Sequence, residues 1–245
     1  MNLYGLIGFP LEHSFSEKYF QHKFEKESIH DSIFRLFPLT SIKLFPQLLT
    51  DHSNLIGLAV TIPYKESVIP YVTELVGAAQ EIQAVNCITI KHNRRIGYNT
   101  DVIGFEKSLL PLLQSHHTHA LILGTGGASK AVQYVLKKLG IHFICVSRNQ
   151  VEMDQTIAYE NINADLLKQC PLIINTTPLG MFPDISTCPP IPYQNVTTKH
   201  LLYDLVYTPS KTKFLQNGAL HGARVKNGME MLEIQAEENW KIWNH

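Results

Sequence analysis

The chain has 245 residues, of which 44% are hydrophobic and 17% are charged, and its formal net charge is zero. This composition supports a large core and excludes a disordered chain, while the length predicts two domains. The absence of a long basic run argues against nucleic acid as a partner, because a nucleic-acid groove needs a concentrated positive field.

Strands and helices alternate through the first hundred residues. Apolar runs predict strands at residues 3–8, 32–38 and 55–62, and residues 84–99 predict a hairpin that turns near Asn93. Aromatic residues at helical spacing predict a helix after Ser16, with this serine as its N-cap, and residues 41–52 predict another helix. The alternation is typical of an α/β fold.

The second half of the chain reads as repeated strand–turn–helix units. Asp101 opens a helical stretch, which a polar linker containing the histidines of HHTH (116–119) follows. Short apolar runs at 120–123, 141–147, 171–175 and 200–206 have spacings that suit a parallel sheet, and Gly228 opens a C-terminal helix. No carboxylate lies close to the histidines in sequence, so we expect a solvated linker there and no metal site.

The sequence GTGGAS directly follows a predicted strand and opens a predicted helix. It fits the pattern G-x-G-x-x-small, in which glycines allow a tight turn and the helix N-terminus faces a pyrophosphate with free N–H groups. A purely structural turn is the alternative, but the strand before and the helix after favour dinucleotide binding. The predicted cofactor-binding residues of this turn are Gly124, Gly126, Gly127, Ala128 and Ser129.

The end of the next strand indicates which dinucleotide is bound. An NAD site normally has an acidic residue there for the ribose hydroxyls, whereas this chain has Ser147, Arg148 and Asn149. An arginine can pair with a 2′-phosphate that an acid would repel. The sequence therefore predicts NADP as the cofactor, although Arg148 could also be a solvated charge at a strand end.

A lysine follows the uncharged strand 55–62. Lys65 lies at its C-terminal end, and Asp101 closes the first half of the chain at the junction of the two predicted domains, where ligands often bind. A lysine beside an aspartate forms a pair that can exchange a proton, and hydride transfer to a ketone leaves an alkoxide that needs one. Lys65 and Asp101 are therefore the predicted catalytic pair. A solvated surface lysine is the alternative.

Several motifs together resemble the shikimate dehydrogenase family over nearly the whole chain. In order they are HSFS (13–16), AVTIPYK (59–65), AVN (84–86), NTD (99–101), GTGGAS (124–129), SRN (147–149), NTTPLG (175–180), YDLVY (203–207) and GMEMLEIQA (228–236). The resemblance implies NADP-dependent reduction of 3-dehydroshikimate to shikimate, and the reverse, in aromatic amino acid biosynthesis. The S-x-S, T-x-P-x-K and N-T-D blocks are its most specific parts.

The resemblance also implies roles for individual residues. Substrate contacts would come from Ser14, Ser16, Thr61, Asn86, Tyr207 and Gln235. Thr176 would lie near the cofactor, and Gly228 would allow close approach to the nicotinamide. For some of these residues a structural role is the alternative: the serines could cap a helix, Asn86 could satisfy a strand edge and Tyr207 could pack in the core.

The resemblance implies an α/β fold with two domains and an active-site cleft between them. Residues 1–103, completed by the C-terminal helix 228–245, would form the substrate-binding and catalytic domain. Residues 104–227 would form a Rossmann-like NADP-binding domain with a central, mostly parallel sheet. A small-molecule substrate is the expected partner, and the chain would be a monomer or homodimer.

Three departures from the family pattern bear on function. Ala59 replaces a frequent asparagine, and Asn227 and Glu230 replace an aspartate and a glycine, which puts an acid near the expected nicotinamide region. The segment after Arg148 carries Glu152 and Asp154 and lacks a second basic residue, so we expect weaker discrimination between NADP and NAD.

Two other functions remain compatible with the sequence. One is a quinate/shikimate dehydrogenase with relaxed or NAD preference, and the other is a non-catalytic ligand or redox sensor on the same fold. The chain has four widely spaced cysteines and no CxxC pair, and its N-terminus lacks the basic region of a signal peptide. No apolar stretch approaches bilayer length. We therefore expect a cytoplasmic protein with no membrane partner.

Overall fold

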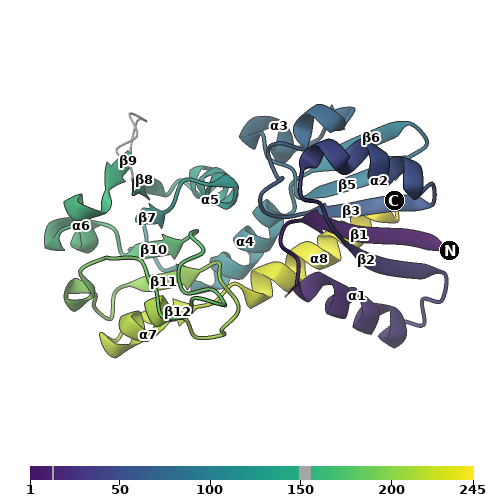
Figure 1. Ribbon diagram of the computed structural model, residues 1–245. Helices are drawn as coiled ribbons and strands as arrows, with labels where there is room; N and C mark the ends of the chain where they lie inside the picture. Colours follow the sequence, from purple (N-terminus) through teal and green to yellow (C-terminus); the bar gives the residue numbers. More distant parts are fainter. Residues whose placement is uncertain (13, 149–155) are drawn as a thin grey trace. The chain divides into compact units, whose positions relative to one another are not determined.

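The chain folds into two compact units, one containing residues 1–100 and 235–245 and the other residues 101–234 (Figure 1). The computed structural model describes residues 1–12, 14–148 and 156–245. In this described part, each unit contains one six-stranded sheet. Strands and helices alternate along both units, so the predicted α/β class is confirmed.

The sheet of the first unit has the strand order β2-β1-β3-β5-β6-β4. Its first three strands run parallel, β5 pairs antiparallel with β3, and β5 and β6 form the predicted hairpin. The strands are β1 (Asn2–Gly8), β2 (Ser32–Pro38), β3 (Leu55–Val60), β4 (Glu74–Leu75), β5 (Cys87–Lys91) and β6 (Arg94–Tyr98). The helices are α1 (Phe15–Lys26), α2 (Phe45–Asp51), α3 (Ala78–Ile82) and the end of α8 (Met229–Trp243).

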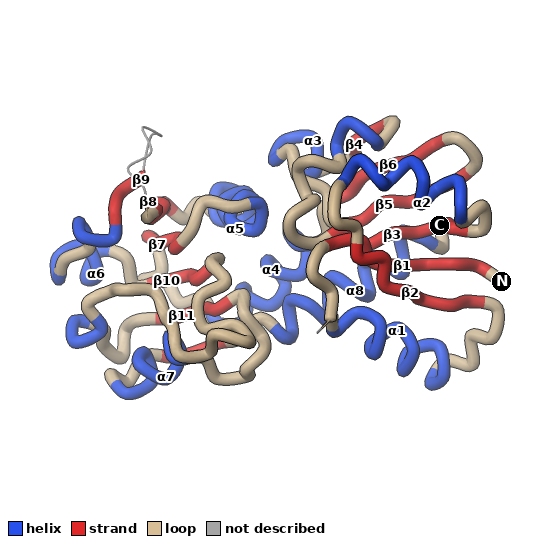
Figure 2. Tube along the Cα trace, in the orientation of Figure 1, coloured by secondary structure: helices blue, strands red, loops and turns tan. Residues whose placement is uncertain are grey.

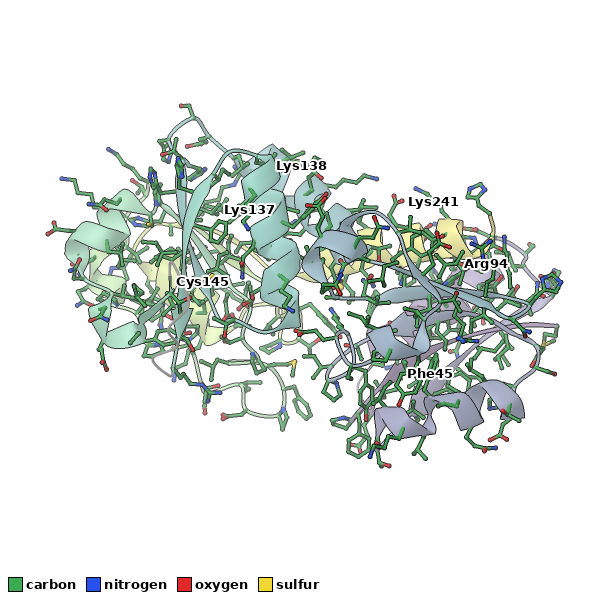
Figure 3. All side chains as sticks on the ribbon, turned by 90° about the horizontal axis from the view of Figure 1, so that it is seen from above. Phe45, Arg94, Lys137, Lys138, Cys145 and Lys241 are labelled. Atoms are coloured by element: carbon green, nitrogen blue, oxygen red, sulfur yellow. The ribbon has the colours of Figure 1, made fainter. Side chains whose placement is uncertain are left out.

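Both faces of this sheet are covered, which explains why β3 is apolar throughout. Leu58 faces a buried cluster that includes Phe45 of α2, which is labelled in Figure 3. The next residue, Ala59, faces the opposite cluster, which includes Trp243 of α8. Figure 2 shows α2 on one side of the strands and α1 on the other. Successive side chains of a strand point to opposite faces, so a strand covered on both faces needs apolar residues at every position.

The predicted N-cap of α1 is wrong by two residues. The helix begins at Phe15, and Ser14 is the N-cap: its backbone is extended and its Oγ accepts a hydrogen bond from the backbone N–H of Ser16 at 3.3 Å. Ser16 is therefore a helical residue, and it is buried. The motif contains two serines two positions apart, and helical spacing alone does not decide which of them lies outside the helix.

The second unit has an entirely parallel sheet with the order β12-β11-β10-β7-β8-β9. The chain starts in the middle at β7, moves outward through β8 and β9, and then returns to build the other half from β10, which is the doubly wound order of dinucleotide-binding folds. The strands are β7 (His119–Leu123), β8 (His142–Ser147), β9 (Thr156–Ala158), β10 (Leu172–Asn175), β11 (Leu201–Asp204) and β12 (Arg224–Lys226). The helices are α4 (Asp101–Leu109), α5 (Gly127–Lys138), α6 (Ala164–Gln169), α7 (Lys213–Leu220) and the start of α8.

Helices cover both faces of this second sheet as well. Leu202 lies in a buried cluster with Leu167 of α6 and Phe214 of α7. On the other face, the ring of Phe105 from α4 packs edge-on against Tyr203 with 5.2 Å between centroids. Because the elements on both faces bury apolar side chains, the unit has a core of its own.

The cysteines have free thiols, and three of the four are buried: Cys87, Cys145 and Cys170. Figure 3 shows Cys145 among the side chains of the second unit. Burial raises the pKa of Cys170 to about 11, so its thiol is protonated and unreactive at neutral pH. Among the described residues, no three or more His, Cys, Asp or Glu side chains gather as metal ligands would. None of the described helices combines the length and hydropathy needed to cross a bilayer.

Candidate active site

The backbone around Lys65 is held at two points. The hydroxyl of the neighbouring Tyr64 is buried and donates to the carbonyl of Leu39 at 2.5 Å, and the carbonyl of Lys65 accepts from the N–H of Val85 at 2.7 Å. The lysine side chain is half-buried. An apolar strand is thus followed by a lysine whose backbone is held in place.

A buried group of polar side chains lies in the same unit. Asn86 Nδ2 donates to Gln235 Oε1 at 3.2 Å and to Thr100 Oγ1 at 3.0 Å. The backbone N–H of Thr100 donates to Asn86 Oδ1 at 2.6 Å. Two of the predicted substrate residues, Asn86 and Gln235, are therefore in direct contact although 149 positions separate them in the sequence.

The other predicted substrate residues lie outside this buried group. Ser14 and Ser16 are hydrogen-bonded to each other at the N-cap of α1. Thr61 follows β3, where its N–H donates to the carbonyl of Ile7 at 2.9 Å. Tyr207 follows β11 in the second unit and is half-buried.

Asp101 is the first residue of α4 and is only 6% exposed. A carboxylate in the first turn of a helix is stabilised by the N–H groups that lack intrahelical partners and by the helix dipole. The residue before it, Thr100, belongs to the buried polar group around Asn86. The NTD motif thus joins that group to the start of α4.

The predicted cofactor residues Gly124 and Thr176 meet at the carboxyl edge of the parallel sheet. Gly124 follows β7 with φ +109°, and a Cβ there would lie 2.7 Å from Thr176 Oγ1, so the contact requires glycine. Thr176 follows β10, and both its N–H and its hydroxyl donate to the carbonyl of Leu123 at 2.9 Å. Since β7 and β10 are the central strands of the doubly wound order, this is the switch point where ligands bind in such folds.

The start of α5 is open. Gly126 is its N-cap and Gly127 its first residue, and no side chain caps the helix. A Cβ at Gly126 would meet nothing within 4 Å. Ser129 is fully buried and its hydroxyl donates to the carbonyl of Gly126 at 2.8 Å, which fixes the turn from inside. The free N–H groups of an uncapped helix start form a site suited to a phosphate.

Ser147 ends β8, beside β7, and Arg148 follows it with an exposed side chain. Burial raises the pKa of the Tyr159 phenol to about 12, and the positive charge of Arg148 opposes this rise. Asn149 lies outside the described residues. So do Glu152 and Asp154, which belong to the segment that predicts weaker discrimination between NADP and NAD.

Comparison with known proteins decides the family. Residues 6–88 match the shikimate dehydrogenase substrate binding domain. A shikimate dehydrogenase (NADP(+)) of Clostridium botulinum is 35% identical over 247 residues, which span 98% of this chain and 95% of that protein. The chain belongs to the shikimate dehydrogenase family.

Solved structures of this family have the same fold as the chain. Shikimate dehydrogenase from Aquifex aeolicus superposes with a TM-score of 0.88 at 29% identity, covering 100% of this chain and 92% of that one. The Thermus thermophilus enzyme, solved in complex with NADP(H) and shikimate, gives a TM-score of 0.86 at 26% identity over 99% of this chain and 93% of that one.

The departures from the family pattern have local explanations. Ala59 lies in the apolar cluster that includes Trp243, so the alanine that replaces the family's asparagine has apolar neighbours. Glu230 forms an ion pair with Lys226, four residues earlier, which balances the extra acid. Asn227 accepts from the N–H of Met229 at 3.3 Å and donates to the carbonyl of Ser210 at 2.9 Å, so it holds the start of α8.

Sequence reasoning missed a buried carboxylate at the carboxyl edge of the second sheet. Asp204 ends β11 and is fully buried, and it accepts from Asn175 Nδ2 at 2.9 Å, the Val206 N–H at 3.0 Å and Thr212 Oγ1 at 2.5 Å. Asn175 in turn accepts from the N–H and the hydroxyl of Thr177. Asp204 thus ties the loops after β10 and β11 together. An acidic residue in an otherwise apolar strand was the signal in the sequence that could have predicted this site.

The titration of Asp204 gives a testable pH dependence. Burial raises its pKa from 3.8 to about 6, against the hydrogen bonds from Thr212, Val206 and Asn175, which lower it. Its folded pKa is above the unfolded value, so protonation favours the folded state: this contribution is fully present below about pH 4 and is lost as the pH rises through 6. In urea unfolding, wild type should gain roughly 2.5 kcal/mol relative to Asp204→Asn between pH 7.5 and 4. A difference that does not vary with pH would contradict the raised pKa.

Gly228 is required by packing. A Cβ at this position would lie 2.2 Å from the carbonyl oxygen of Leu205, so the segment after β11 would have to move. We expect Gly228→Ala to destabilise the protein by roughly 1–3 kcal/mol in urea unfolding. Gly126→Ala is the matched control, because its Cβ meets nothing within 4 Å. It loses only the preference of a helix N-cap for glycine over alanine, so its stability should fall by less. Equal stability of the Gly228→Ala variant and wild type would leave only a cofactor contact as the reason for this glycine.

Proposed function

We propose that the chain is an NADP-dependent oxidoreductase that reversibly reduces 3-dehydroshikimate to shikimate. The observation that carries this proposal is the 35% identity to the Clostridium botulinum shikimate dehydrogenase (NADP(+)) along 98% of the chain. A small molecule is therefore its substrate.

The residues at the switch point of the second sheet fit NADP. The close contact of Gly124 with Thr176, the open space at Gly126 and the uncapped start of α5 together suit a pyrophosphate. Arg148 supplies a positive charge beside Ser147, where an NAD site would have an acid. NADP would accept or supply the hydride. The second domain, predicted as residues 104–227, is then the cofactor-binding domain.

We assign the proton transfer of this reaction to Lys65 and Asp101. In shikimate oxidation, the carbon that bears the reacting hydroxyl loses a hydride and the hydroxyl oxygen loses a proton. The lysine takes this proton, and the carboxylate of Asp101 stabilises the charged form of the lysine. The first domain, predicted as residues 1–103 with 228–245, would bind the substrate through Ser14, Ser16, Thr61, Asn86 and Gln235, with Tyr207 closing the site. The free buried cysteines support a reducing, cytoplasmic location.

The test is turnover of purified protein with shikimate, followed by nicotinamide absorbance at equal concentrations of NADP⁺ and NAD⁺. We expect reduction of NADP⁺ with a clear preference over NAD⁺. Quinate in place of shikimate is the parallel arm: faster turnover with quinate would change the substrate assignment. Binding of NADPH without turnover of either acid would overturn the proposal in favour of a sensor.

A further inference from the structure

Four buried side chains of the first unit form what we call the amide cluster. Its members leave little surface in solvent: Thr100 0%, Asn239 1%, Asn86 2% and Gln235 9%. Asn239 lies one helical turn after Gln235 on the same face of α8. Buried amides must satisfy their donors and acceptors inside the protein, so the hydrogen bonds of the cluster determine which way each amide points.

The direction of these bonds is set by one backbone group. The N–H of Thr100 can only donate, and it lies 2.6 Å from Asn86 Oδ1, so the oxygen of this amide faces Thr100. Asn86 Nδ2 must then donate, and it does so to Thr100 Oγ1 at 3.0 Å and to Gln235 Oε1 at 3.2 Å. The atom of Gln235 that faces Asn86 is therefore its oxygen.

Asn239 acts on the same oxygen from the other side. The hydroxyl of Thr100 lies 3.1 Å from Asn86 Oδ1, which already accepts from the Thr100 N–H, and 2.6 Å from Asn239 Oδ1. We therefore assign its single hydrogen to the shorter contact, with Asn239, while its oxygen accepts from Asn86 Nδ2. With its oxygen occupied, Asn239 turns Nδ2 toward Gln235 Oε1, at 3.4 Å. Gln235 Oε1 thus accepts from two amides, while its Nε2 donates to no other group in the described part of the chain.

From this network we infer that Asn239 is a positioning residue, which together with Thr100 and Asn86 presents Gln235 to the substrate as a hydrogen-bond donor only. The substrate group it contacts is then an acceptor, a carboxylate or hydroxyl oxygen of the ring acid. This inference rests on the proposed function, in which Gln235 binds the substrate. It adds to that function the direction of the hydrogen bond, from Gln235 to the substrate, and a role for Asn239, which belongs to none of the predicted sites.

The first experiment measures whether Asn239 acts through Gln235. Asn239→Ala should raise the KM for shikimate roughly fivefold to twentyfold and leave the KM for NADP⁺ unchanged. In a Gln235→Ala background the same substitution should have no further effect on the shikimate KM, because the group it positions is gone. Lys241→Ala is the matched control on α8, and Figure 3 labels this lysine. Its side chain is 56% exposed and pairs with Glu238.

The second experiment tests the polarity directly. Gln235→Glu keeps the size and the acceptor that faces Asn86 and Asn239, but replaces the outward donor with a carboxylate oxygen. The KM for shikimate should rise on the order of a hundredfold at pH 8, and the loss should shrink as the pH falls, since a protonated glutamate regains a donor.

Each outcome has one meaning. Additive effects of Asn239→Ala and Gln235→Ala, or a Gln235→Glu variant with a wild-type shikimate KM, overturn the inference while the proposed function stands. Absence of shikimate turnover by the wild-type protein overturns the proposed function, and the inference falls with it. A lower melting temperature for Asn239→Ala with an unchanged shikimate KM shows a structural role alone and also overturns the inference.

Discussion

Lys65→Ala is expected to lower kcat for shikimate oxidation by roughly 10²–10⁴-fold, the usual contribution of a positioned acid–base group. The backbone at Lys65 is held by Val85 and by the buried Tyr64, neither of which depends on the lysine side chain, so the fold should persist. Dissociation constants for shikimate and NADPH, measured by calorimetry, should change far less than kcat. Lys43→Ala, at an exposed position of the same unit, is the matched control and should keep wild-type turnover.

Asp101→Asn tests the other member of the pair. The substitution keeps the size of a side chain that is only 6% exposed and removes its charge, and we expect a strong loss of turnover in a folded protein. Circular dichroism and urea unfolding report the fold. Turnover equal to wild type would remove Asp101 from the catalytic pair, and loss of turnover and of folding together would assign it to the start of α4 instead. A ligand sensor would keep its binding response in both variants and show no turnover in the wild type.

Local patterns predicted most of the fold because they report local physics. The uncharged run of β3 predicted a strand, and the clusters around Leu58 and Ala59 show that both faces of this strand are covered. The glycine turn predicted the β7–α5 connection, and the structure has Gly124 with positive φ and Gly126 as the N-cap of α5. Each of these features depends on residues within one element or one turn, so the sequence carries them without tertiary information.

The features that the sequence did not predict depend on partners far away in the chain. Asn86 meets Gln235 across 149 positions, and Thr100 meets Asn239 across 139. Asp204 acquires its raised pKa from burial among elements that only the folded chain assembles. Glu230 is an instructive exception, since its partner Lys226 is four residues away. That pair spans the end of β12 and the start of α8, so a helical spacing rule applied within α8 alone misses it.

Arg148→Ala should raise the KM for NADP⁺ by roughly 10–100-fold and leave the KM for NAD⁺ within about twofold of wild type. The physical reason is that the guanidinium pairs with the 2′-phosphate, a group that NAD⁺ lacks. Arg148→Lys keeps the charge and loses the bidentate geometry of the guanidinium, so it should recover only part of the affinity for NADP⁺. Steady-state kinetics with both cofactors at saturating shikimate measure the effect, and equal losses for the two cofactors would contradict the 2′-phosphate assignment.

The neighbourhood of Arg148 supplies the control that separates this role from a structural one. The buried hydroxyl of Tyr159 has no hydrogen-bond partner among the described residues, and the charge of Arg148 lowers its pKa against the effect of burial. Tyr159→Phe removes that hydroxyl and keeps the arginine, so it should leave the ratio of the two cofactor KM values unchanged. If Tyr159→Phe shifts the ratio as Arg148→Ala does, Arg148 acts by supporting Tyr159. If only Arg148→Ala shifts it, the arginine itself selects the cofactor.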